Sequence, residues 1–588
     1  MLSASIVNRL KKDCNEEGYG EVFYFFFQTD ATKMMEPIYA LRAIAAQLFQ
    51  SRRTEQHILD KFLFVMEEQS GGQVTATSIE LVDILRSCFE ESGPIWMVID
   101  GIDECKDING LLKYLLQLLA TASCKSLFLS RPNVHGLMKS TTNDLRFQVN
   151  KRCISRDIRI YVSRLLNELI DDEELFPQDN DVSSLVERLV YGADGMFLWA
   201  RLMMSYLSSP MLTPENRIQT IVHVLLPEGL EQMYERILNM IAQGGHTQQM
   251  LARRIFAWLT YSATTLTIRQ LHEAITIEEA RDSEKDHTSK YADFTQTVII
   301  TCGGLVDQHF VDPVNHQGET TFGFIHLSIF QFFQHLSKHW QRYEFGKIKA
   351  TGEPLLYSRP QAHIHLAITC LWNLTYYFPA QPLSGKVTQG VDCRILAESF
   401  PFGAYSAQYW ISHLQELIEP DADGMLKATT SDHTKDLRVL LQTLSMFLSN
   451  PLVLMTWIEA FYTFSDKSKN RLPSRSLFEW CGWARCKIES SPALSHYSTL
   501  CEELVDFSRD LSALSQEWGV NLTNTPEIIW NEVTAFSKSR FFVETCSTTI
   551  TSLAPQPFSQ QSTKPLSTIS GVNPDASSVA VLSIWPPR

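Results

Sequence analysis

The feature that most constrains the fold of this chain is a short apolar run that ends in a cluster of carboxylates. The string Ile-Trp-Met-Val-Ile-Asp-Gly-Ile-Asp-Glu begins at Ile95 and ends at Glu104. A continuous apolar run of about five residues is typical of a strand buried on both faces of a parallel sheet. Because such sheets bind ligands at the carboxyl ends of their strands, the carboxylates lie where a ligand is expected.

The acidic residues of this string carry the predicted chemistry. Asp100, at the end of the expected strand, is the candidate metal ligand, because a carboxylate there can hold Mg²⁺ directly or through water. Asp103 and Glu104 are the candidate catalytic residues, because an acidic group at this position can orient or deprotonate an attacking water. Gly101 permits a tight turn between them. The alternative is that these acidic residues cap the following helix.

The first 150 residues alternate strands with helices. Continuous apolar runs predict strands over residues 22–27, 95–99 and 126–129. The spacing of apolar residues predicts helices over residues 1–13, 36–50, 79–89 and 111–119. This alternation predicts a mostly parallel, doubly wound sheet.

From residue 151 onward the pattern is mostly helical. Thr267 and Gln270 have the spacing of a capping box at the start of a helix, and β-like segments follow near 304–311 and 320–325. Helices followed by a small hairpin are the outline of a winged helix. The predicted fold class is therefore α/β plus all-α: an α/β domain at 1–150, a helical domain at 151–248, a winged-helix domain at 249–350, a C-terminal helical region at 351–546 and a Ser/Thr/Pro-rich tail at 547–588.

Composition narrows the expected partners and location. The net charge of −15 argues against broad nucleic-acid binding. No stretch approaches the ~18 apolar residues of a membrane span, and the N-terminus lacks the apolar core of a signal peptide. We therefore expect no membrane contact and a cytoplasmic location. The 12 cysteines form no C-x-x-C pair, so no zinc site is predicted.

The string that ends at Glu104 resembles the Walker B motif of NACHT domains, which belong to the STAND class of P-loop NTPases. Ser130-Arg131-Pro132 is similar to the sensor-1 element of that family, and the resemblance implies that Arg131 binds the γ-phosphate. A guanidinium suits this role because it is always charged and can donate two parallel hydrogen bonds to phosphate oxygens. The alternative for Arg131 is a helix-capping or surface arginine.

A second family motif contains His326. The string from Phe324 to Phe333 resembles the winged-helix motif of the family, which implies that His326 contacts the β-phosphate of ADP and holds the resting state closed. The alternative is a histidine whose hydrogen bonds are satisfied between a strand and a helix. Other strings, over residues 25–28, 193–201 and 226–238, resemble the filamentous-fungal branch, and the resemblance covers residues 1–350.

The chain departs from the family pattern in two places. No G-x-x-x-x-G-K-[ST] phosphate-binding loop occurs in it, and in the family this loop directly precedes the helix that begins here near Leu2. The loop and the strand before it would therefore precede Met1. Without that central strand, a P-loop sheet is incomplete and its neighbouring strand is left uncovered. In addition, Gly195-Met-Phe-Leu stands where relatives often carry Gly-x-Pro, whose proline packs near adenine.

Two functions fit the sequence. The first is an NLR-like signalling switch that binds ATP or GTP with Mg²⁺ and forms a homo-oligomer with protein partners when active. The second is a nucleotide-free scaffold, without cofactor, that binds proteins through its helical regions. Whether the chain is an enzyme stays open, because hydrolysis in the family depends on the absent loop. Contact of the winged helix with DNA is disfavoured by the acidic balance.

Overall fold

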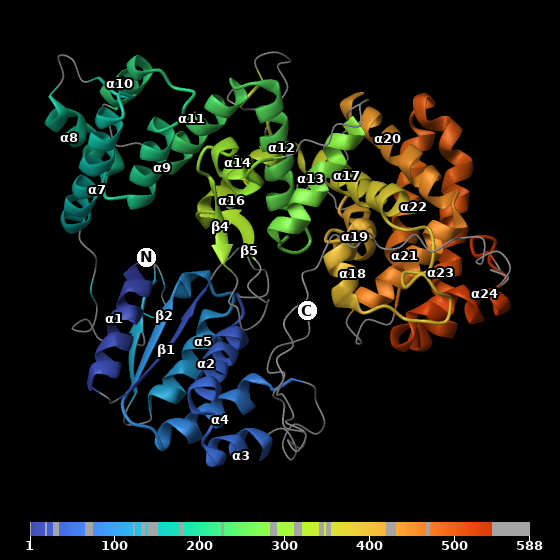
Figure 1. Ribbon diagram of the computed structural model, residues 1–588, viewed down its shortest axis with the longest axis horizontal. Coiled ribbons are helices and arrows are strands. Elements are labelled where there is room, and N and C mark those ends of the chain that lie inside the picture. The colour runs from blue at the N-terminus through green and yellow to red at the C-terminus, as the bar shows by residue number, and fades with distance from the viewer. Residues whose placement is uncertain are drawn as a thin grey trace. The chain divides into compact units, whose positions relative to one another are not determined.

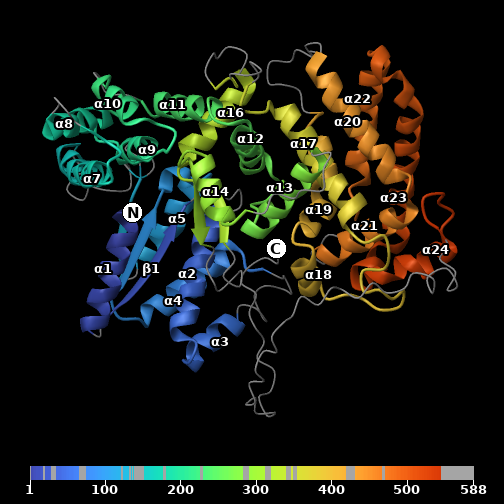
Figure 2. The same cartoon turned by 45° about the horizontal axis from the view of Figure 1, so that its top comes forward.

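The computed structural model divides the chain into two compact units, one spanning Met1–Asn150 and the other beginning at Lys151 (Figure 1 and Figure 2). The residues that the structure describes are 2–17, 20–27, 35–64, 75–120, 124–130, 134, 137, 147, 151–176, 181–224, 229–282, 291–310, 320–339, 346–348, 354–418, 431–465 and 471–543. The predicted tail at 547–588 lies outside them. Helices dominate the described chain, as predicted.

A parallel sheet in the order β1-β2-β3 forms the centre of the first unit. Its strands are β1 (Glu21–Phe26), β2 (Ile95–Asp100) and β3 (Cys124–Phe128). Glu21 lies opposite Ile95, and Ile95 lies opposite Cys124, so the carboxyl ends of the strands meet at one edge. The parallel sheet predicted for this part of the chain is confirmed.

Helices pack on both faces of this sheet (Figure 1). The helices of the first unit are α1 (Leu2–Glu17), α2 (Pro37–Arg52), α3 (Gln56–Phe64), α4 (Ser78–Glu90) and α5 (Ile108–Leu119). Alternate strand residues share a face, so Phe23, Phe25, Met97 and Ile99 enter one core with α2, α4 and α5. The helix α1 packs against β1 and β2, and its Val7 is buried.

β3 is the least covered strand of the sheet. Lys125 and Leu127 lie in register with Trp96 and Val98, yet both are exposed, and Leu127 exposes 39% of its surface. Among the described residues, β2 is the one strand that pairs with β3. This exposure is unusual for a strand of a parallel sheet, because such strands are normally buried on both faces.

The second unit begins with helices and continues into a small hairpin. Its first elements are α7 (Lys151–Asp171), α8 (Val182–Ala193), α9 (Phe197–Leu207), α10 (Pro214–Val222), α11 (Leu230–Ala242), α12 (His246–Tyr261), α13 (Ile268–Asp282), α14 (Phe294–Thr301), β4 (Val306–Phe310), β5 (Thr320–Phe324) and α16 (Leu327–His339). β4 and β5 pair antiparallel. The predicted capping box is confirmed, since the Thr267 N–H donates to Gln270 Oε1 at 2.9 Å and the Gln270 N–H donates to Thr267 Oγ1 at 3.3 Å.

The remaining described chain is helical around a core rich in tryptophan. Its elements are α17 (Arg359–Trp372), η5 (Asn373–Tyr377), α18 (Cys393–Ser399), α19 (Gly403–Gln415), α20 (Ser431–Leu448), α21 (Pro451–Phe464), α22 (Ser474–Glu489), η6 (Pro492–Tyr497), α23 (Ser498–Asn524), η7 (Pro526–Trp530) and α24 (Glu532–Phe536). Trp410 and Trp457 pack edge to face with ring centres 5.5 Å apart. In the described chain no single helix has the length and apolar character of a membrane span. The segments Thr434–Leu448 and Pro451–Phe464 have that length and apolar character only when counted together, and they meet at a bend of 93°.

Candidate functional site

Asp100 lies where the sheet meets the first turn of α1. It is the last residue of β2, and its Oδ2 accepts a hydrogen bond of 2.6 Å from the hydroxyl of Ser3. Ser3 is only 5% exposed, so this contact is inside the fold. The N-terminus of a helix carries partial positive charge and free N–H groups. The candidate metal ligand therefore lies beside a helix end that favours anions.

Ser3 is a site residue that sequence reasoning missed. The residues of the pair are 97 positions apart, and no local pattern connects them. The available signal was a small hydroxyl side chain in the first turn of the expected helix. Such a group can reach a carboxylate at the end of a neighbouring strand, because parallel strands and the helices between them share one edge.

A tight turn follows Asp100. Gly101 has a φ of 71°, and a Cβ there would lie 3.1 Å from the carbonyl oxygen of Phe27. The Phe27 N–H donates to the Asp100 carbonyl at 3.0 Å, so β1 approaches this turn closely. A left-handed residue with so little space must be glycine, as the sequence predicted.

Asp103 and Glu104 lie in the short 3₁₀-helix η2 (Ile102–Glu104), directly after this turn. The side chains of Asp103 and Glu104 are half-buried, whereas Ile102, the first residue of η2, is fully buried. The next helix, α5, is capped by Asp107, whose Oδ1 accepts the Gly110 N–H at 2.8 Å. The capping role proposed as the alternative for these carboxylates is thus taken by Asp107. The structure places Asp103 and Glu104 within a few residues of Asp100, and their catalytic role stays a prediction.

Arg131, the expected sensor-1 arginine, comes shortly after the end of β3 in the sequence. Ser130 follows β3, and the Ile102 N–H donates to the carbonyl of Leu129 at 3.3 Å, so the end of β3 is beside the acidic turn. Arg131 and Pro132 lie outside the described residues. The phosphate contact of Arg131 stays a prediction.

His326 lies in the second unit, between β5 and α16. Its Nδ1 accepts the backbone N–H of Ser328 at 3.1 Å and is 2.7 Å from the Ser328 hydroxyl, which in turn lies 2.7 Å from the hydroxyl of Tyr234. Because a backbone N–H donates to Nδ1, the neutral ring carries its proton on Nε2. This arrangement agrees with a histidine satisfied between strand and helix, and the phosphate contact of His326 stays a prediction.

The oxygen atoms beside the acidic turn are of the kind that bind Mg²⁺. Carboxylate and hydroxyl oxygens, as in Asp100 and Ser3, are ligands that this ion accepts. Within the described ranges, however, no group of three or more His, Cys, Asp or Glu side chains could hold a metal ion unaided. A magnesium ion beside Asp100 would need further oxygens, from water or from a bound phosphate.

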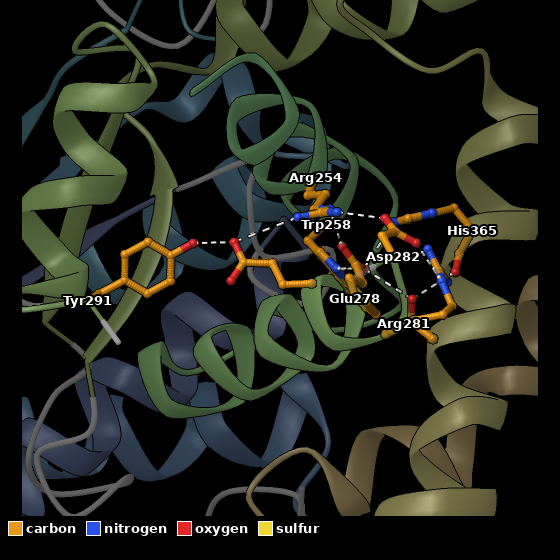
Figure 3. Close-up of polar contacts among 9 residues, drawn as sticks. Arg254, Trp258, Glu278, Arg281, Asp282, Tyr291 and His365 are labelled. Carbon is orange, nitrogen blue, oxygen red and sulfur yellow. Dashed lines mark hydrogen bonds and ion pairs between the residues drawn. The ribbon is translucent and has the colours of Figure 1, made fainter. Parts of the chain in front are cut away.

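A second set of charged residues, which the sequence did not reveal, is buried between α12, α13 and α17 (Figure 3). Glu278 is fully buried, and its Oε1 accepts from Trp258 Nε1 at 2.8 Å and from the Thr369 hydroxyl at 3.1 Å. His365 Nε2 lies 3.0 Å from the same oxygen. Helices distant in sequence thus share one carboxylate.

Arg254 and Arg281 supply the permanent positive charges of this set. The Nη2 of Arg254 donates to Asp282 Oδ2 at 2.6 Å, and its Nε lies 3.5 Å from Glu278 Oε2. Burial opposes the charge on Glu278, but the positive groups of His365 and Arg254 outweigh burial and lower the pKa of this carboxyl. The ion pairs connect α12, α13 and α17, which suits a structural role in joining helices.

Comparison with known proteins gives one match. Residues 1–131 match a family model described as "Nephrocystin 3, N-terminal". The matched stretch contains the sheet and the acidic turn, but that family is not itself the NACHT family. Searches of curated proteins and of solved structures found no match to this chain.

Proposed function

We propose that the chain is part of a NACHT-type STAND signalling NTPase, an NLR-like switch that closes on a nucleotide and opens for assembly. The observation that supports this proposal is the contact of 2.6 Å between Ser3 in the first turn of α1 and Asp100 at the end of β2. A helix N-terminus favours phosphate oxygens, and an adjacent carboxylate favours the Mg²⁺ that accompanies them.

In this proposal the nucleotide is ATP or GTP with Mg²⁺. Asp100 holds the metal, while Asp103 and Glu104 orient or deprotonate the attacking water. Arg131 donates to the γ-phosphate. His326 donates to the β-phosphate through Nε2, since its Nδ1 is occupied by a backbone N–H. The helical second unit provides the surfaces for protein partners and for homo-oligomer formation.

Nucleotide affinity is the property that tests the proposal, because the chain as given contains no phosphate-binding loop. We expect a fluorescent ATP or GTP analogue to bind the purified chain with a Kd below ~1 mM, in a Mg²⁺-dependent manner. Asp100→Asn should raise this Kd by at least about 10-fold, since it removes the charge that faces the metal.

Asp107→Asn is the matched control for that titration. It removes one negative charge seven positions further along the chain, yet asparagine caps a helix as well as aspartate does, so α5 keeps its N-cap. Binding weaker than ~1 mM, or equal weakening by both variants, would remove the support for a nucleotide switch.

A nucleotide-free scaffold is the second candidate, and exposed aromatic side chains favour it. Phe536 of α24 is 76% exposed and stacks on Trp518 of α23 with ring centres 6.3 Å apart. Aromatic side chains are enriched at protein–protein interfaces. Light scattering distinguishes the two functions. A mass that rises only with nucleotide supports the switch, and a mass independent of nucleotide supports the scaffold.

A further inference from the structure

Two buried histidines face each other between α17 and α19. The Nδ1 atoms of His363 and His413 are 3.1 Å apart, and the two side chains are 5% and 1% exposed. At this distance and burial, one nitrogen must donate a proton and the other must accept it.

The partners at the two ends determine which histidine donates. The Ala263 N–H donates to the Tyr405 hydroxyl oxygen at 2.9 Å, and that hydroxyl lies 2.9 Å from His413 Nε2. The hydroxyl still has its own proton to donate, and His413 Nε2 is an acceptor within hydrogen-bond distance, so we assign Tyr405 as the donor, which leaves the proton of His413 on Nδ1. His413 then donates to His363 Nδ1, whose own proton is on Nε2. That Nε2 is 4.0 Å from the carboxylate of Glu416, an acceptor. The direction assigned from Tyr405 thus agrees with the side on which the Glu416 carboxylate lies.

A second proton does not fit this chain of hydrogen bonds. While His413 keeps its proton on Nδ1, protonation of His363 would place two N–H donors against each other across 3.1 Å. Protonation of His413 would instead set its Nε2–H against the donor hydroxyl of Tyr405. Either charge would be buried without a new acceptor, which is costly in a protein interior.

The surrounding groups offer a positive charge little compensation. Tyr261 of α12 packs edge-on against the His363 ring, and Tyr409 packs beside Tyr405. The nearby carboxylate of Glu416 is already paired with Arg359 of α17. Burial, followed by the neighbouring His413 and Arg359, lowers the pKa of His363 to about 2, and burial lowers the pKa of His413 to about 3.

We propose that His363 and His413 form an acid-sensitive joint, which holds α17 against α19 while both rings are neutral and opens more often, as a minor form of the protein, as the pH falls below about 6.5. The reason is linkage: both rings titrate near pH 6.5 once they are solvated, but stay neutral in the packed joint. The open form therefore gains up to two protons. Its population should rise about 100-fold between pH 7.5 and pH 5.5, because each ring contributes a factor of ~10.

Hydrogen exchange of the full chain at these two pH values, corrected for the intrinsic exchange rate, tests the joint. We expect local opening of α17 and α19 to increase about 100-fold at pH 5.5, while α23 changes much less. The double variant His363→Asn/His413→Asn keeps neutral hydrogen-bonding groups and should lose the pH response. Equal exchange at both pH values, or an equal rise in α23, would overturn the proposal.

Nitrogen NMR of ¹⁵N-histidine-labelled protein provides a test that requires no stable variant. At pH 7 the pair should show His413 protonated on Nδ1 and His363 protonated on Nε2, with no imidazolium signal from either ring at pH 6. His326 serves as an internal reference, since the Ser328 N–H donates to its Nδ1 and its proton is on Nε2. The opposite pair of tautomers, or a charged ring at pH 6, would refute the hydrogen-bond direction on which the joint depends.

Discussion

Glu278→Gln is the substitution whose effect can be worked out most fully from the structure. The glutamine retains an oxygen for Trp258 and Thr369, which donate to Oε1 at 2.8 and 3.1 Å. It removes the negative charge that lies 3.0 Å from His365 Nε2. The charge is therefore lost at a fully buried position, and the new amide NH₂ faces the Nε of Arg254, where the carboxylate oxygen lay at 3.5 Å.

The expected loss of stability follows from the remaining partners. Removing one member of a buried ion pair costs about 3–5 kcal/mol. Arg254 keeps Asp282 at 2.6 Å, so we expect the lower end of that range, about 3 kcal/mol in the free energy of unfolding. Because the pKa of Glu278 is lowered in the folded state, this contribution is present above about pH 4.3 and disappears as the pH falls through the folded pKa.

Urea denaturation followed by tryptophan fluorescence and circular dichroism measures this loss. Glu187→Gln is the matched control, because it breaks another Arg–Glu contact of the second unit. Glu187 Oε1 lies 2.8 Å from Arg159 Nε, and both side chains are exposed. An exposed pair contributes only about 0–1 kcal/mol. If Glu278→Gln costs no more than Glu187→Gln, or if the loss persists undiminished at acid pH, the reasoning about the buried charge is refuted.

Two further substitutions test other parts of the fold. Glu459 is buried, and its Oε2 accepts from Leu383 N at 3.0 Å and Trp530 Nε1 at 2.6 Å, while burial raises its pKa to about 7. Ionisation then destabilises the fold as the pH rises from about 4.3 to 7. Glu459→Gln should therefore stabilise the fold by ~3–4 kcal/mol at pH 8 and by little at pH 4.5, in thermal or urea unfolding. Gly101→Ala should cost about 1–2 kcal/mol, measured by hydrogen exchange of β2. Its control, Gly482→Ala, fills open space on α22 and should stabilise that helix by ~0.5–1 kcal/mol.

The local elements were predictable because their signals are local. The run from Ile95 to Ile99 is β2, and residues 22–27 and 126–129 overlap β1 and β3. The helices expected at 36–50, 79–89 and 111–119 appear as α2, α4 and α5, with ends shifted by a few residues. The periodicity of apolar residues indicates which face of an element is buried. It does not fix the first and last residues of the element, because these depend on the hydrogen bonds made at its ends.

The candidate site was predictable in part. The acidic turn at Asp100, Asp103 and Glu104 was evident from residue types and from the position of a strand end. The Nδ1 contact of His326 with Ser328 was not, because it depends on how α16 starts after β5. Its Nε2 is the nitrogen on which the phosphate role now depends.

The sequence alone determined the strand that ends in carboxylates, the alternation of strands and helices before residue 150, and the mostly helical character of the residues after it. Only the tertiary structure decided which side chains meet. Ser3 reaches Asp100 across 97 positions, Thr369 reaches Glu278 across 91, and His363 reaches His413 across 50. Burial and proton positions follow from such long-range contacts, because the free energy of a charge or a hydrogen bond depends on its neighbours in space rather than in sequence.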